Sequence, residues 1–194
     1  MRILYLHGFD STGEQTRANL EKALAVSRYK DLGYTIDLAS YDSWTTASKI
    51  YAGLHKTLFD TFPGPAVLVG SSLGGFWANL MARENAYPCV LINPVYSPSK
   101  SLKIRQIAQL GDSYWGFEGS GHGSDIPGCR QTVLIGLKDE ILDPRKVAHH
   151  YRHSNILVYF EEEKHRFVEY GPVINTIIST AEAYQTHYGN SKTI

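Results

Sequence analysis

The central stretch of the sequence reads Ala66-Val67-Leu68-Val69-Gly70-Ser71-Ser72-Leu73-Gly74-Gly75-Phe76-Trp77-Ala78. A short apolar run leads into Gly-x-Ser-x-Gly, and a segment with helical periodicity follows. This order of strand, sharp turn and helix raises a serine nucleophile above the end of a sheet. Gly70 and Gly74 lack the Cβ atoms that would collide where such a strand and helix pack together. The stretch therefore predicts Ser72 as a nucleophile, with a purely structural βα turn as the alternative.

Two backbone N–H groups are candidates for stabilising an oxyanion near Ser72. The helix after the turn would begin at Leu73, which places the Leu73 N–H at the positive end of that helix. A second donor should come from the loop after the first strand, where Gly8 lets the backbone approach a substrate and the Phe9 N–H would be the donor. Removing one such donor typically costs about 2.7–4 kcal/mol of transition-state stabilisation.

Short apolar runs alternate with amphipathic segments along the whole chain. The expected strands span 2–6, 34–39, 66–70, 89–92, 132–136 and 155–160, and the expected helices span 15–28, 43–59, 73–85, 99–110, 144–151 and 172–184. This alternation predicts a three-layer α/β/α architecture, in which a mostly parallel sheet of about six strands carries helices on both faces. Ligands of such sheets bind at the carboxyl ends of the strands, so the loops that follow the strands are the candidate site.

Composition and charge narrow the class of protein and its partners. The 194 residues suit a single domain over 1–194, and 19 basic residues balance 19 acidic ones, so neither a nucleic acid nor an anionic membrane is an expected partner. Cys89 and Cys129 form no metal-type spacing and no disulfide framework, which favours a reducing compartment. The apolar run at 3–6 is too short for a signal peptide or a membrane span, and we therefore expect a cytoplasmic protein.

A histidine is the expected base, because a free serine hydroxyl is a poor nucleophile at neutral pH. Of the eight histidines, His7 and His165 directly follow predicted strands. His165 comes after the last strand and is the predicted base, whereas His7 is interpreted as bracing the first loop. His122 lies in an irregular segment and stays an alternative. Four further histidines fit surface positions, namely His149, His150, His153 and His187.

An acid is needed to orient the imidazole and to stabilise its cation. Three candidates follow the strand at 132–136, namely Asp139, Glu140 and Asp143. Asp139 is favoured because it lies closest to the end of the strand. Asp143 precedes a proline and could instead cap the next helix. The resulting order of serine, acid and histidine along the chain is typical of α/β-hydrolases.

The segment 95–130 is the least regular part of the sequence, and only 99–110 within it has helical character. We expect this segment to line or cover the site. Its aromatic residues Tyr114, Trp115 and Phe117 would wall an acyl pocket, with a role in the local core as the equal alternative.

Five motifs resemble those of the YqiA/YcfP-type small α/β-hydrolases. They are Leu6-His7-Gly8-Phe9-Asp10-Ser11, Gly70-Ser71-Ser72-Leu73-Gly74-Gly75, Ile92-Asn93-Pro94, Asp139-Glu140-Ile141-Leu142-Asp143 and Lys164-His165-Arg166-Phe167. The resemblance implies a trimmed α/β-hydrolase fold that begins at what is usually the third strand. It also implies carboxylesterase-like activity on short acyl esters without a metal or cofactor, with Ser72, Asp139 and His165 as the triad.

These observations predict a serine carboxylesterase that acts on a small acyl ester through an acyl-enzyme intermediate. An acyl thioesterase would use the same residues, and a non-catalytic acyl-binding protein could keep the same fold. A phosphate- or nucleotide-binding loop is disfavoured, because neither Gly-x-x-x-x-Gly-Lys-Ser/Thr nor Gly-x-Gly-x-x-Gly is present.

Overall fold

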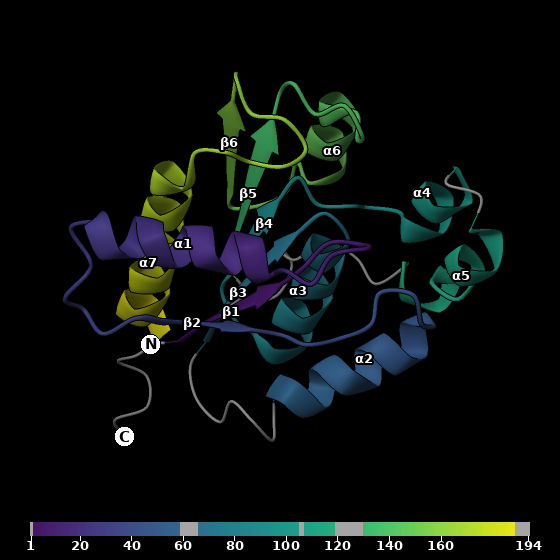
Figure 1. Cartoon of the computed structure of the whole chain (residues 1–194), viewed down its shortest axis with the longest axis horizontal. Helices are drawn as coiled ribbons and strands as arrows, with labels where there is room; N and C mark the ends of the chain where they lie inside the picture. The colour runs from purple at the N-terminus through teal and green to yellow at the C-terminus, as the bar shows by residue number, and fades with distance from the viewer. Residues whose placement is uncertain (1, 59–65, 105–106, 119–129, 189–194) are drawn as a thin grey trace.

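A parallel sheet forms the centre of the computed structural model, which describes residues 2–58, 66–104, 107–118 and 130–188 (Figure 1). The strands of the described chain are β1 (Arg2–Leu6), β2 (Thr35–Leu38), β3 (Ala66–Ser71), β4 (Cys89–Ile92), β5 (Gln131–Gly136) and β6 (Ile156–Phe160). They form one six-stranded sheet in the order β2-β1-β3-β4-β5-β6, and each neighbouring pair is parallel. The predicted parallel sheet is confirmed, with β2 at an edge.

Helices cover both faces of this sheet. They are α1 (Glu14–Val26), α2 (Ala47–Lys56), α3 (Leu73–Asn85), α4 (Pro98–Ile104), α5 (Ala108–Asp112), α6 (Pro144–His150) and α7 (Tyr170–Tyr188). Figure 1 shows α1 crossing α7 on one side of the sheet, with α2 and α3 away from this pair and α4 beside α5 at one end of the molecule. The predicted three-layer architecture is therefore confirmed.

Successive residues of each strand enter different cores, because side chains alternate between the faces of a sheet. In β1, Leu4 and Leu6 pack in the core shared with α2, α3 and α6, whereas Ile3 and Tyr5 pack in the core shared with α1 and α7. The inner strands β1, β3, β4 and β5 are buried on both faces, which explains their largely continuous apolar runs, whereas the edge strands β2 and β6 are partly exposed.

The expected helix at 99–110 is wrong as a single element. The structure has α4 and α5 instead, and Ile107 before α5 has φ −112° and ψ 55°, which no helix adopts. The last helix begins two residues before its expected start, at Tyr170. Pro172 is accommodated there because the N–H groups of the first helical turn have no intrahelical partner.

Several sequence-based expectations fall outside the described residues. They concern Phe59 at the end of the second helix, His122, Cys129, most of the segment 119–130 and the tail 189–194. Among the residues that are described, none of the helices has both the length and the apolarity needed to span a bilayer.

Candidate active site

Ser72 lies in the sharp turn between β3 and α3, and its backbone conformation is unusual. Its φ of 53° and ψ of −120° are outside the regions that residues with a side chain normally occupy. The Ser72 N–H donates to the Ile92 carbonyl at 3.0 Å, and the Ser72 carbonyl accepts from the Val95 N–H at 2.9 Å. The neighbouring strand and its loop therefore hold the serine in this conformation.

The two glycines of the turn are required by close packing. A Cβ atom on Gly70 would lie 2.1 Å from the Gly74 carbonyl oxygen, and one on Gly74 would lie 2.1 Å from the Leu6 carbonyl oxygen. These neighbours are backbone atoms, so a rotamer change cannot relieve either collision. The first turn of α3 can cross β3 and β1 this closely only with glycine at both positions.

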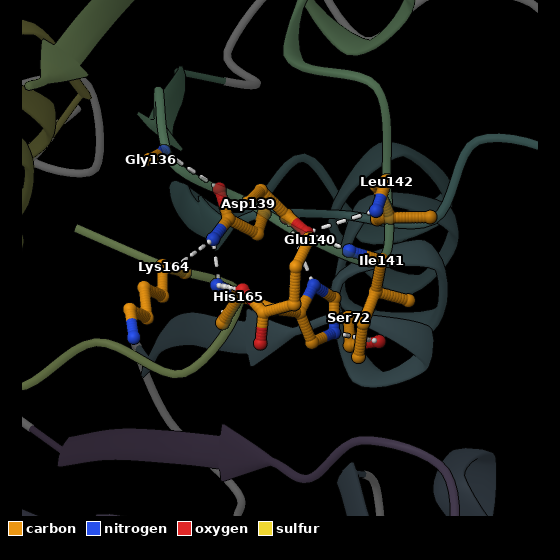
Figure 2. Close-up of polar contacts among 9 residues, drawn as sticks. Ser72, Gly136, Asp139, Glu140, Ile141, Leu142, Lys164 and His165 are labelled. Carbon is orange, nitrogen blue, oxygen red and sulfur yellow. Dashed lines mark hydrogen bonds and ion pairs between the residues drawn. The ribbon is translucent and has the colours of Figure 1, made fainter.

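The structure brings Ser72, His165 and Asp139 into one hydrogen-bonded line, drawn in Figure 2. His165 Nε2 lies 2.9 Å from Ser72 Oγ, and His165 Nδ1 lies 2.9 Å from Asp139 Oδ2. The side chains of His165 and Asp139 are only 7% and 2% exposed. A carboxylate can only accept, so Nδ1 carries the proton and Nε2 is left free to accept from the serine hydroxyl.

The three candidate acids have three different contacts. Asp139 Oδ1 accepts from the N–H groups of Ile141 and Leu142, both at 2.8 Å, which leaves Oδ2 for the imidazole. Asp143 caps α6 by accepting from the Arg145 N–H at 3.0 Å. Asp143 therefore has the helix-capping role that the sequence offered as an alternative. Asp139 is the acid that faces His165.

Glu140 contacts the backbone of the loop between β6 and α7, which contains His165 and which we call the histidine loop, rather than the imidazole. Its Oε2 accepts from the His165 N–H at 3.2 Å. Its own backbone N–H and that of His165 stabilise the charged carboxylate, and these hydrogen bonds lower the pKa of Glu140 from its ordinary value.

Asn93 is a central residue of the site to which sequence reasoning assigned no role. It follows β4, is 1% exposed and has a positive φ of 42°. Its Nδ2 donates to the carbonyls of Lys164 at 2.8 Å and His165 at 3.2 Å, and its Oδ1 accepts from the Gly136 N–H at 2.8 Å. One buried amide thus joins the ends of β4 and β5 to the histidine loop. The available signal was an asparagine directly after a buried strand, a residue that tolerates positive φ.

The loop after β1 brings Phe9 next to the serine. A Cβ atom on Gly8 would lie 3.3 Å from Ser72 Cβ, so the two backbones approach closely. His7 is buried and stacks on Tyr41 with ring centroids 4.0 Å apart, and its ring nitrogens lie 2.8 Å from the Gly8 carbonyl and 3.1 Å from the Tyr41 carbonyl. These contacts fit the bracing role expected for His7. Within the described chain, the N–H groups of Phe9 and Leu73 have no hydrogen-bond acceptor.

Two cavities meet at Ser72, each of about 270 Å³. The first, which we call the apolar cavity, is lined mainly by Phe9, Val95, Pro98, Leu102, Ile141 and Leu142. The second, which we call the polar cavity, is lined by His165, Arg166 and the hydroxyl and amide side chains of the loop after β1 and of α1, together with apolar residues that include Phe9, Ile92 and Phe167. The site is therefore two-sided, with the serine at the junction.

The expected aromatic wall is not part of either cavity, and this prediction needs correction. Tyr114 is fully buried against Trp77, with ring centroids 5.4 Å apart. Phe117 also packs on Trp77, at 5.6 Å. Trp115 is 56% exposed, and its Nε1 donates to Asp112. Tyr114 and Phe117 instead belong to the local core, which the sequence analysis gave as the alternative. Both rings pack beside α3 and do not lie at the edge of the sheet that carries Ser72.

In the part of the chain that the structure describes, no three His, Cys, Asp or Glu side chains gather in a way that could hold a metal ion.

Sequence comparison identifies relatives over nearly the full chain. A model of the family "Uncharacterised protein family (UPF0227)" matches residues 2–121. A UPF0227 protein of Shewanella woodyi is 24% identical over 192 residues, covering 94% of this chain and 98% of the relative. A UPF0227 protein of Citrobacter koseri is 25% identical over 181 residues, covering 90% of this chain and 96% of the relative.

Solved structures share the fold at lower identity. Est1E from Butyrivibrio proteoclasticus, with ferulic acid bound, superimposes with a TM-score of 0.69 at 14% identity, covering 95% of this chain and 89% of Est1E. The mouse alpha/beta hydrolase domain-containing protein 10 superimposes with a TM-score of 0.64 at 18% identity, covering 95% of this chain and 90% of the mouse protein. The predicted fold, a trimmed α/β-hydrolase fold, is therefore confirmed.

Replacing Asn93 with alanine should strongly destabilise the protein. The change leaves the Gly136 N–H and the Lys164 carbonyl without their buried partner, and each such group costs about 1–3 kcal/mol. Alanine also tolerates the positive φ less well than asparagine. We expect the free energy of unfolding, measured by urea denaturation, to fall by about 2–5 kcal/mol.

Asn175→Ala is the control, because Asn175 is an exposed residue of α7 and alanine favours helix. It should leave stability equal or slightly higher. Equal stability of Asn93→Ala and the wild type would contradict the role assigned to this amide.

Proposed function

The chain belongs to the UPF0227 family, and from its site we infer that it is a serine carboxylesterase that cleaves small or short-chain acyl esters. The observation that carries this proposal is the line of two 2.9 Å contacts from Asp139 through His165 to Ser72. A buried carboxylate, an imidazole with a free ring nitrogen and a serine in a strained turn are what nucleophilic acyl transfer requires. The fold shared with Est1E, whose structure holds ferulic acid, is consistent with this chemistry.

In the proposed reaction, Ser72 Oγ attacks the acyl carbonyl while His165 Nε2 takes the hydroxyl proton. The oxyanion of the tetrahedral intermediate accepts from the N–H groups of Phe9 and Leu73. His165 then gives its proton to the leaving oxygen as the bond to the acyl carbon breaks. Water, deprotonated by His165, releases the acid from Ser72 in the second half of the reaction. Asp139 holds the imidazole in the required tautomer throughout.

The apolar cavity is the proposed acyl pocket. Val95, Leu102 and Leu142 line it and are at most 8% exposed, so they form a largely buried wall beside Ser72. Its volume of about 270 Å³ lies just below the range of about 300–1,000 Å³ that is usual for small-molecule sites. A short acyl chain therefore suits it better than a long lipid chain.

Hydrolysis of p-nitrophenyl esters tests this function. The wild type should cleave the acetate and butyrate well and the octanoate and palmitate progressively less, because the longer chains exceed the acyl pocket. Ser72→Ala should lower kcat by at least about 10⁴-fold, since it removes the nucleophile.

Ser71→Ala serves as the matched control, because the Ser71 hydroxyl contacts the Tyr5 hydroxyl at 2.7 Å rather than the imidazole. It should keep most of the rate. Normal turnover by Ser72→Ala would refute the assignment, and turnover of thioesters alone would refute the choice of esters.

The two neighbouring aspartates allow the acid to be tested directly. Asp139→Asn should lower kcat by about 10⁴-fold, because the amide can donate to Nδ1 and so favours the wrong tautomer of His165. Asp143→Asn should keep most of the rate, and its stability should hardly change because asparagine caps helices as well as aspartate does. Steady-state kinetics of the two variants would measure this, and the reverse order of effects would move the acid role to Asp143.

A further inference from the structure

The two-sided site indicates which part of an ester lies in which cavity. In the proposed reaction the leaving oxygen must reach His165 Nε2, since this nitrogen returns the proton. Among the described residues, His165 lines the polar cavity and is not part of the wall of the apolar cavity. The alcohol part of the substrate therefore extends into the polar cavity, and the acyl part extends the opposite way.

The wall of the polar cavity is suited to a hydrophilic group. Hydroxyl and amide side chains from the loop after β1 and the first turns of α1 line it, namely Ser11, Thr12, Gln15, Thr16 and Asn19. The Gln15 amide nitrogen donates to the Asn19 amide oxygen at 3.1 Å. This contact leaves the Gln15 oxygen as an acceptor and the Asn19 nitrogen as a donor for a ligand. A polar alcohol could form hydrogen bonds with these groups, whereas a hydrocarbon alcohol could not.

Arg166 gives this cavity a positive charge. It follows His165 directly, and no aspartate or glutamate is among the described residues that line the cavity. Two acids close to it in the chain have other partners: Glu162 pairs with Lys138, and the Glu163 carboxylate accepts from the N–H groups of Val168 and Glu169 at 2.8 Å. In the described chain, Arg166 has no carboxylate within ion-pair distance. A guanidinium without a counter-ion is well suited to a carboxylate or phosphate group.

We propose that the preferred substrates are short acyl esters of small hydrophilic alcohols that carry an anionic group, with Arg166 as the residue that recognises the anion. This inference rests on the proposed esterase function and specifies its substrate class. Arg166 does not touch the reacting atoms, so its effect should be on the choice between leaving groups rather than on chemistry common to all esters. The cavity volume of about 270 Å³ suits an alcohol of the size of a small hydroxy acid.

The test compares pairs of butyrate esters that differ only in charge. The pairs are O-butyryl glycolate with O-butyryl glycolamide, and O-butyryl 4-hydroxybutanoate with its amide. The measured quantity is the kcat/KM of the carboxylate ester divided by that of the amide, obtained from butyrate release. Intrinsic reactivity differs within a pair but cancels when the same ratio is compared between wild type and variant.

Arg166→Gln should lower this ratio about three- to tenfold for at least one pair, as expected for the loss of a single partly exposed charge contact. Lys164→Gln removes the same charge from a neighbouring exposed side chain that lines neither cavity, and it should keep the wild-type ratio. Added salt should lower the wild-type ratio and leave that of Arg166→Gln nearly constant.

Equal ratios in the wild type and Arg166→Gln for both pairs would overturn the inference while leaving the esterase function in place. An equal fall in Arg166→Gln and Lys164→Gln would also overturn it, because the effect would then be one of net charge. A wild type that cleaves p-nitrophenyl butyrate but releases no butyrate from any of the four esters would overturn the inference alone. Failure on the four esters and on p-nitrophenyl butyrate would refute the proposed function, and the inference would fall with it.

Discussion

The close crossing of α3 over β3 and β1 is the constraint on which the rest of the site depends. Gly74 lies against the Leu6 carbonyl and Gly70 against the Gly74 carbonyl, at distances that exclude any Cβ atom. This contact forces the sharp turn that gives Ser72 its positive φ. The same turn makes Leu73 the first residue of the helix, so its N–H points away from the helix and has no intrahelical acceptor. Nucleophile and oxyanion donor therefore follow from one packing requirement.

Parallel strands bring the remaining parts of the site to the same edge of the sheet. Asp139 follows β5 and His165 follows β6, so their loops are neighbours because β5 and β6 are paired. Asn93 after β4 fixes both loops through one buried amide. Buried polar groups of this kind are costly when unpaired and rigid when fully bonded. The carboxylate, imidazole and hydroxyl are thus held in line by backbone contacts rather than by the side chains alone.

The sequence predicted the features that depend on a local pattern of residues, such as the strands and the loops that follow them. It did not predict the contacts that depend on how separate segments pack together. Apolar runs identified the described strands except β2, which was recognised by its alternating, β-rich pattern at 34–39. The position of Asp139 and His165 after strands placed them at the right edge. Asn93 received no role, because nothing in its neighbourhood shows which carbonyls a side-chain amide will meet. Tyr114 was expected in the pocket but is buried beside Trp77, since aromatic character does not distinguish a pocket wall from a core. The break at Ile107 was missed for a similar reason: its backbone conformation is not encoded by the apolar spacing around it.

The central claim is that Ser72 is a nucleophile activated by His165, and reaction with a fluorophosphonate tests it most directly. The reagent forms a stable bond with an activated serine oxygen and mimics the tetrahedral intermediate. After labelling, digestion and mass spectrometry should find one phosphonyl group, on the peptide that contains Ser72, and labelling should be much slower in Asp139→Asn. An unlabelled protein, or a label on any serine other than Ser72, would contradict the account.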